Sequence, residues 1–295
     1  MGTRRTIPQS SPPPEYLKYY FQNAFKNYHN FRWEKTTSIE KIEEYSSQLL
    51  KGDNITISRF NDGEWAYALD IDSWKTAPMK NRNKGYEDVL YKEGQKLLQI
   101  IESTPQYLIS IDKASLTQDL SQEKILPYVK NLNFIGSGVF NIWSLYTGFK
   151  DLFKVFNQRK TIVIGPEFLE NLPFKFTHYK TPLKGVNYKI DFYVKEIEKL
   201  IKTIWEPNMV IIYSCSFLAK ISLDNLYQKY GDTITQLDMG ASLNPFVGYS
   251  NRPWHNEIIN EIEEKKKEKN YIRTDRIVEK NGLIYYKKIY KNDIE

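Results

Sequence analysis

The sequence alternates short apolar runs with longer stretches in which apolar residues recur every three or four positions. The short runs have the length and composition of buried strands. They cover 55–59, 107–111, 132–136, 161–165, 209–213 and 234–238. The longer stretches have the period of amphipathic helices. They cover 37–52, 86–103, 139–153, 190–204 and 216–231.

This alternation predicts an α/β fold with a doubly wound, mostly parallel, Rossmann-like sheet. Crossovers between parallel strands are right-handed, so they bring the C-terminal ends of all strands to one edge. Open sheets of this kind bind their ligands at that edge. The residues that follow each predicted strand are therefore the first candidates for a functional site.

The two ends of the chain differ from this central pattern. Residues 1–15 are rich in Pro and Ser, and we expect a disordered lead-in there. Residues 16–250 form the predicted α/β nucleotide-sugar-binding domain, beginning with a helical extension. Residues 251–295 read as an appendage made of an exposed helix and a hairpin that turns at Asn281-Gly282.

Composition and charge exclude several classes of protein. The chain has 295 residues, one cysteine (Cys215) and three histidines, so neither a disulfide framework nor a Cys-rich zinc site is expected. The net charge of +6 is spread along the chain, and its densest run, 263–269, mixes signs, so we predict no nucleic-acid partner. No 18-residue apolar stretch and no secretory signal are visible, which predicts a cytoplasmic protein without a membrane span. Peripheral contact with a membrane stays open.

Small and hydroxyl-bearing residues follow several of the predicted strands. They leave backbone N–H groups open at helix N-termini, a geometry that suits phosphate oxygens. The residues that we expect to contact a phosphate at these corners are Gly165, Ser214 and Ser216. The full set of corners reads Gly136-Ser137-Gly138, Gly165-Pro166-Glu167, Ser214-Cys215-Ser216 and Asp238-Met239-Gly240.

The first strand leads into the stretch SRFNDGEW, which has two acidic residues at a spacing of two. On extended backbone Asp62 and Glu64 would point to the same side, and the glycine between them would let a ligand approach. Carboxylates without His or Cys suit Mg²⁺ or Mn²⁺, and Arg59 could bind a phosphate with two N–H groups. In the alternative interpretation, Asp62 caps the next helix and Glu64 lies in its first turn. Both interpretations stay open.

The stretch SRFNDGEW resembles the RFGDGE signature of the GT-D glycosyltransferases. Further matches follow in the same order as in that family. They are GYEDVLYKEGQKLLQII, YLISID, TIVIGPEFLENL and a closing strand–helix–strand that ends in Asp238-Met239-Gly240. The resemblance covers residues 55–250 and implies transfer of a sugar from a nucleotide-sugar donor to a glycan acceptor on a protein or lipid.

The resemblance also implies roles for particular residues. Asp62 and Glu64 would bind Mn²⁺ or Mg²⁺ and the donor's diphosphate, with Arg59 beside them and Asp238 lining the site. Asn61 stands where the family has Gly. Asn also tolerates positive φ, so the turn need not change. Asn61 is expected to help bind the diphosphate. Ser214-Cys215-Ser216 likewise replaces a usual Gly and narrows the approach, which leaves the sugar and base unassigned, although a UDP-sugar is favoured.

Glycosyl transfer needs stabilisation of the leaving diphosphate, which the metal, Arg59 and the helix N-termini after Gly165 and Ser214 would supply. An inverting enzyme also needs a carboxylate base near the acceptor hydroxyl. Asp238 and Asp112 are the leading candidates because each follows a predicted strand.

Other functions are compatible with parts of the sequence. Gly136-Ser137-Gly138 is an incomplete dinucleotide fingerprint, because Asn141 stands where a third Gly belongs, and it suggests a methyltransferase or dehydrogenase. Cys215 at a strand–helix corner suggests a nucleophile, but a buried thiol is the expected role. A non-catalytic nucleotide-binding module is the third alternative.

Overall fold

The computed structural model describes the sheet, its covering helices and a C-terminal hairpin. The described residues are 39–70, 87–111, 124–125, 127–128, 132–136, 139–140, 143–144, 149–250, 255–256, 259–260, 277–280 and 283–286. The predicted lead-in over 1–15 lies outside them, as do most of the helical N-terminal extension and Asp112.

The described part of the chain forms a seven-stranded sheet in which every pair of neighbouring strands is parallel. The strand order is β3-β2-β1-β7-β6-β4-β5. The strands are β1 (Thr56–Phe60), β2 (Leu108–Ile111), β3 (Phe134–Gly136), β4 (Thr161–Pro166), β5 (Thr177–Thr181), β6 (Val210–Tyr213) and β7 (Thr235–Asp238). The predicted doubly wound α/β fold is confirmed, and all six predicted strands are present.

One strand was not predicted. β5 has the sequence THYKT, which contains no apolar run. It pairs with β4 alone and forms one edge of the sheet, so most of its side chains are exposed or half-buried. An edge strand is held by its hydrogen bonds to one neighbour and needs little burial, which is why its sequence gives no hydrophobic signal.

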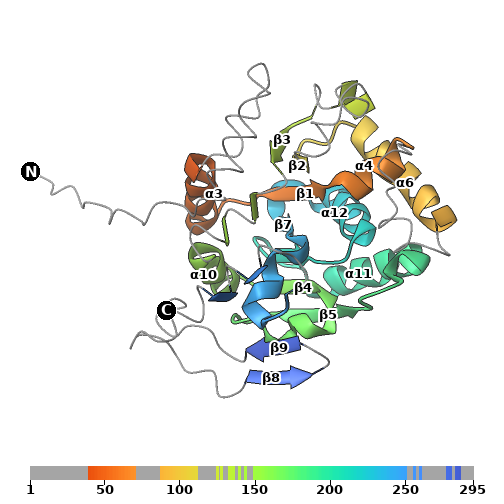
Figure 1. Cartoon of the computed structure of the whole chain (residues 1–295). Coiled ribbons are helices and arrows are strands. Elements are labelled where there is room, and N and C mark those ends of the chain that lie inside the picture. Colours follow the sequence, from red (N-terminus) through yellow and green to blue (C-terminus); the bar gives the residue numbers. More distant parts are fainter. Residues whose placement is uncertain are drawn as a thin grey trace, which may run out of the picture.

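Helices cover both faces of the sheet (Figure 1). One face carries α4, α6, α11 and α12, and the other carries α3, α10 and two 3₁₀ helices, η2 and η5. Their bounds are α3 (Ile39–Lys51), α4 (Asp62–Ala68), α6 (Glu87–Glu102), α10 (Lys150–Gln158), η2 (Glu167–Asn171), α11 (Ile190–Ile204), α12 (Phe217–Tyr230) and η5 (Gly240–Val247). Strand residues alternate between the two cores: Ile162 and Ile164 join the first, and Val163 joins the second.

Four of the predicted helices match α3, α6, α11 and α12 to within two residues at each end. The fifth, over 139–153, is wrong as a continuous helix. Phe149 has a positive φ of 59° and is the N-cap of α10, so a helix cannot run through it, and α10 continues to Gln158.

In the C-terminal appendage, β8 (Ile277–Lys280) and β9 (Leu283–Tyr286) pair antiparallel, which confirms the hairpin, while its turn residues lie outside the described part. Among the described helices, none combines the length and the apolar character needed to cross a membrane.

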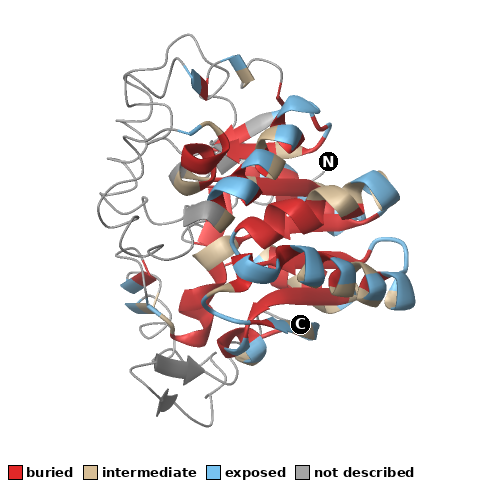
Figure 2. Cartoon of the chain, turned by 90° about the vertical axis from the view of Figure 1, so that its right-hand side faces the viewer, coloured by how far each residue is buried: buried red, intermediate tan, exposed pale blue. Residues whose placement is uncertain are grey.

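The topology creates a switch point between β1 and β7. After β1 the chain adds β2 and β3 on one side, whereas β4 to β7 fill the other side. Parallel sheets of this kind have a crevice where the strand order reverses, beyond the C-terminal ends of the strands. The strands themselves are buried between the helical layers (Figure 2). Arg59 near the end of β1 and Asp238 at the end of β7 therefore lie at this switch point.

Candidate functional site

The corner between β1 and α4 begins with Asn61, the N-cap residue of α4, with extended backbone (φ −94°, ψ −176°). The backbone N–H of Asn61 donates to Oε2 of Glu64 at 3.1 Å, which is the returning half of a capping box. The alternative role predicted for Asp62 as the cap is thus wrong, because Asp62 is already the first residue of the helix.

The helical backbone at this corner changes the geometry expected for the two acidic positions. We expected Asp62 and Glu64 on extended chain, where residues two apart point to the same side. Both lie in the first turn of α4. Helix positions are about 100° apart, so residues two apart do not face each other. That premise is wrong, whereas the metal site itself stays a prediction because the side chain of Asp62 is outside the described part.

A buried cluster of charged side chains lies at the switch point. Nζ of Lys220, on α12, lies 2.9 Å from Oε1 of Glu64 on α4 and 3.0 Å from Oδ2 of Asp238 on β7. The side chains are 4%, 10% and 1% exposed, respectively. One ammonium group thus joins a helix start, a strand end and a second helix at the C-terminal edge of the sheet.

Arg59 completes this cluster from the end of β1. Its backbone N–H donates to Oδ2 of Asp238 at 3.1 Å, and its Nη1 donates to the carbonyl oxygen of Met239 at 2.9 Å. Gly240 makes room for the guanidinium: a Cβ at this position would lie 2.5 Å from Nη1, and the residue has a φ of +53°. Asp238 therefore accepts a hydrogen bond from the backbone of Arg59, Met239 accepts one from its guanidinium, and Gly240 leaves space beside that guanidinium.

The charges of this cluster balance, since Arg59 and Lys220 face two carboxylates. Burial alone would raise the pKa of Glu64, but the charge and hydrogen bond of Lys220 lower it below its ordinary value. Burial raises the pKa of Asp238, and Lys220 and Arg59 offset only part of that rise. For Lys220, burial would lower the pKa, but its two carboxylate partners raise it. The ammonium therefore stays charged in the interior.

The corner between β6 and α12 lies beside the cluster. Oγ of Ser214 donates to the carbonyl oxygen of Gly240 at 2.7 Å, and the carbonyl oxygen of Ser216 accepts from Nζ of Lys220 at 3.3 Å. Ser216 is the N-cap of α12 with a φ of 55° and a ψ of −138°. This backbone conformation favours glycine, so Ser216 adopts it at some cost in strain.

Gly165 also reaches this corner, but protein atoms fill the space beside it. A Cβ at Gly165 would lie 2.8 Å from Cδ1 of Leu169 and 3.2 Å from Cβ of Ser214. The glycine thus allows the ends of β4 and β6 to pack closely. Its predicted contact with a phosphate stays a prediction, as do those of Ser214 and Ser216 and the base roles of Asp238 and Asp112.

Two alternatives from the sequence lose support. Cys215 is 5% exposed, and burial raises the pKa of its thiol, with the charge of Asp238 adding to the rise. It is therefore the buried, unreactive thiol that was expected. Gly136 ends β3, the other edge strand, so the incomplete dinucleotide fingerprint lies two strands away from the β1/β7 crevice.

Sequence reasoning missed Lys220. The signal was present, because this lysine is the one charged residue in the first half of α12 and stands among apolar neighbours. Eight residues of α12 are buried: Phe217, Leu218, Ala219, Lys220, Ile221, Ser222, Leu223 and Leu226. A charged residue on a buried helix surface needs a partner, and the nearest acidic strand end would have been the place to look for one.

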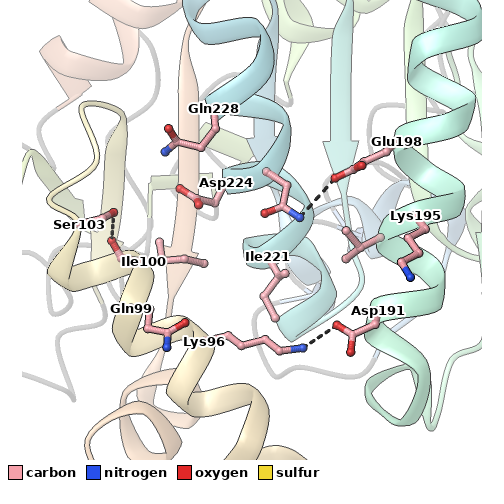
Figure 3. A pocket seen from close by; sticks show the side chains of 12 residues that line it. Lys96, Gln99, Ile100, Ser103, Asp191, Lys195, Glu198, Ile221, Asp224 and Gln228 are labelled. Atoms are coloured by element: carbon pink, nitrogen blue, oxygen red, sulfur yellow. Dashed lines mark hydrogen bonds and ion pairs between the residues drawn. The ribbon is translucent and has the colours of Figure 1, made fainter.

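A second polar region lies on the outer side of the same helix layer. A groove of about 770 Å³ runs over α12 between α6 and α11 (Figure 3). Nζ of Lys96, on α6, lies 2.9 Å from Oε2 of Glu93 and 2.6 Å from Oδ1 of Asp191 on α11. In Figure 3, Lys96 and Asp191 reach toward each other across one end of the groove.

No group of three or more His, Cys, Asp or Glu residues suited to a metal ion occurs in the described part of the chain. The predicted Mn²⁺ or Mg²⁺ site also fits Glu64 poorly, because the ammonium of Lys220 lies 2.9 Å from its Oε1 and the Asn61 N–H already donates to its Oε2.

Comparisons with known proteins gave two matches, both to solved structures. No family model matches the sequence, and neither does any curated protein. One structure is described as showing that the highly conserved domain of unknown function 1792 has a distinct glycosyltransferase fold. It aligns with a TM-score of 0.46 and 16% identity over 69% of this chain and 78% of that chain.

The other structure is a selenomethionine-substituted form of domain of unknown function 1792. It aligns with a TM-score of 0.45 and 17% identity over the same shares of the two chains. The chain is thus similar to two structures of domain of unknown function 1792, one of them described as having a glycosyltransferase fold, and both TM-scores are below 0.5. Likeness of this degree does not transfer an activity, so the chemistry of this chain must be argued from its own residues.

Proposed function

We propose that this chain is a glycosyltransferase that moves a sugar from a nucleotide-diphosphate donor, with a UDP-sugar favoured, to a hydroxyl group of a glycan acceptor. The observation that carries the proposal is the meeting of two distant stretches at the β1/β7 crevice. Arg59 and Asp238 are 179 residues apart in the chain, yet they are in direct contact. Arg59 lies in the stretch that resembles the GT-D signature, and Asp238 ends the closing strand–helix–strand that also resembles that family. They meet at the edge where such sheets bind ligands.

The donor's diphosphate would bind to Arg59 and the N-terminus of α12. A guanidinium has five N–H donors. Within the described part, Nη1 of Arg59 donates to Met239, while Nε is buried without a hydrogen-bond partner. The 14-residue helix α12 starts beside it, and its N-terminal N–H groups and dipole favour an anion. These are the groups that we propose bind the two phosphates.

The chemistry of transfer follows from this placement. Cleavage of the bond between the anomeric carbon and the diphosphate leaves negative charge on the phosphate oxygens. Arg59, held by Met239, and the α12 N-terminus would stabilise that charge without rearranging. We propose that Asp238 positions Arg59 and Lys220, because its side chain is 1% exposed and its Oδ2 accepts from both residues.

A divalent cation is not needed for any step proposed here. Asp62 stays a predicted ligand whose side chain is outside the described part, and Glu64 fits a metal poorly. If Mn²⁺ or Mg²⁺ binds with the donor, it would supply further positive charge to the diphosphate.

A thermal-shift screen of UDP-, GDP-, dTDP- and CMP-sugars, each with and without Mn²⁺, tests the proposal, followed by an assay of donor hydrolysis. We expect a UDP-sugar to raise the Tm and the Arg59→Gln variant to bind it at least tenfold more weakly. Arg159→Gln is the matched control. Arg159 precedes β4 and donates to the carbonyl oxygen of Asp53, which precedes β1, so this contact lies at the N-terminal ends of the strands. Loss of the Arg159 side chain should lower the Tm without changing donor affinity.

The screen also separates the alternative functions. NAD and S-adenosylmethionine are added to the screen for this purpose, and a shift with either of them and with none of the sugar nucleotides would favour a dehydrogenase or methyltransferase. Absence of a shift with every nucleotide would reject the transferase, whereas a shift with a sugar nucleotide that is neither hydrolysed nor used for transfer would favour the non-catalytic nucleotide-binding module.

A further inference from the structure

Lys220 has all of its hydrogen-bonding capacity satisfied inside the protein. An ammonium group has three N–H donors. The three acceptors around Nζ are Oε1 of Glu64 at 2.9 Å, Oδ2 of Asp238 at 3.0 Å and the carbonyl oxygen of Ser216 at 3.3 Å. The residue is 3% exposed, so water does not share these contacts. Lys220 is thus a fixed internal cation and is not an available side chain.

Glu64 has a protein partner on each of its carboxylate oxygens. Its Oε1 accepts from Lys220, and its Oε2 accepts from the backbone N–H of Asn61 at 3.1 Å. A divalent ion bound to Glu64 would also lie within a few ångströms of the ammonium, and two such cations repel strongly in a buried site.

We infer that Lys220 is the resident cation of this site: its ammonium occupies the position between Glu64 and Asp238 that a divalent metal would otherwise take. Glu64 is then the counter-ion of Lys220 and not a metal ligand. Both carboxylate oxygens lie within 3.0 Å of one nitrogen, so removal of the lysine side chain leaves two acidic oxygens around a cation-sized space. Hard oxygen ligands in such a space suit Mn²⁺ or Mg²⁺.

Binding of Mn²⁺ to the purified protein, without nucleotide or acceptor, tests this inference. Affinity is measured by electron paramagnetic resonance of free Mn²⁺, and thermal shift is recorded in parallel. We expect the wild-type protein and Glu64→Gln to bind Mn²⁺ equally, within twofold. We expect Lys220→Ala to bind it at least tenfold more tightly than wild type, and Lys220→Ala/Glu64→Gln to lose that gain.

Two results would overturn the inference. The first is a loss of more than tenfold in Mn²⁺ affinity on Glu64→Gln alone, which would make Glu64 a ligand in the natural protein. This arm does not depend on Lys220→Ala folding. The second is a folded Lys220→Ala protein that gains no affinity. Because the test uses neither donor nor acceptor, a failure of the proposed glycosyl transfer would leave its outcome unchanged.

Discussion

Two lysines in this protein make the same kind of contact in different surroundings. Lys220 and Lys96 each bridge two carboxylates, with N–O distances of 2.9 and 3.0 Å for the first and 2.9 and 2.6 Å for the second. The side chain of Lys220 is 4% exposed, whereas that of Lys96 is 28% exposed and its partner Asp191 is 67% exposed. The distances therefore do not distinguish the two sites, but the solvent does.

The difference in solvent decides what each lysine contributes. Lys96 connects α6 to α11 at the rim of the groove, where water and salt screen the attraction (Figure 3). Lys220 is in the interior, where an unpaired charge is costly, so each member of its cluster depends on the others. The buried cluster can thus hold the ends of α4, β7 and α12 in one arrangement, while the exposed one adds a modest connection between two helices.

Removal of each lysine should give the largest difference between the two clusters. Lys220→Met leaves Glu64 and Asp238 buried without their counter-ion, and we expect a loss of about 3–5 kcal/mol in the free energy of unfolding. Lys96→Met should cost less, about 1 kcal/mol, because Asp191 is 67% exposed and can turn to water, although Glu93 is 5% exposed and loses a partner there. Urea unfolding of the two variants measures both values. Equal losses would show that burial does not separate the two clusters.

The next prediction concerns Gly240, which lies against Arg59 in the buried cluster. Gly240→Ala would place a Cβ 2.5 Å from Nη1 of Arg59, and the guanidinium would have to leave the Met239 carbonyl. The φ of +53° adds backbone strain of about 1–3 kcal/mol. We expect a lower free energy of unfolding and weaker binding of a UDP-sugar, measured by urea unfolding and thermal shift.

Gly231 is a matched control for this substitution. It has the same φ of +53°, at the end of α12, but a Cβ there would meet nothing within 4 Å. Gly231→Ala therefore carries the strain without the clash, and it should cost about 2 kcal/mol less than Gly240→Ala, the value of a hydrogen bond to a charged group. If both variants lose the same free energy of unfolding, the space beside Gly240 is not needed for the position of the Arg59 guanidinium.

The sequence predicted most of the fold because strands inside the sheet are rich in apolar residues, and β6, with the sequence VIIY, is a continuous apolar run. Ile211 and Ile212 point to opposite faces of β6, and both faces are covered by helices, so no polar position interrupts the run. β5 could not be found in this way, since an edge strand such as THYKT has little apolar surface to bury. The break before α10 was missed because a left-handed Phe149 has no signature in composition or periodicity.

The site was predictable only in part. The stretch from Arg59 to Glu64 and the Asp238-Met239-Gly240 stretch could be recognised as strand ends. The contact between these two stretches could not be predicted, because it depends on how α12 packs on the sheet. That packing brings Lys220 to both Glu64 and Asp238. The helical backbone at Asp62 was also hidden: whether a residue after a strand is extended or helical depends on where the cap falls, and here the cap is Asn61.

The smallest expected effect comes from the exposed cluster, whose contribution to stability should depend on pH and on salt. Lys96 lowers the pKa of Asp191 below its ordinary value of 3.8, mainly through their hydrogen bond. A lowered pKa in the folded state means that the contribution to stability is present above pH 3.8 and is lost as the pH falls through the lower value. Asp191→Asn should therefore cost about 0.5 kcal/mol at neutral pH and nothing in strong acid.

Salt should separate this effect from the buried cluster. The pKa of Glu64 is also lowered, against the effect of burial, by Lys220, so its contribution has the same sign and is lost below its ordinary value of 4.5. At about 1 M NaCl the Debye length is about 3 Å, and the difference between wild type and Asp191→Asn in urea unfolding should disappear. The difference between wild type and Glu64→Gln should persist, because water and ions do not enter between Glu64 and Lys220. If salt removed both differences, Lys220 would be as accessible to solvent as Lys96, and the distinction between the two clusters would fail.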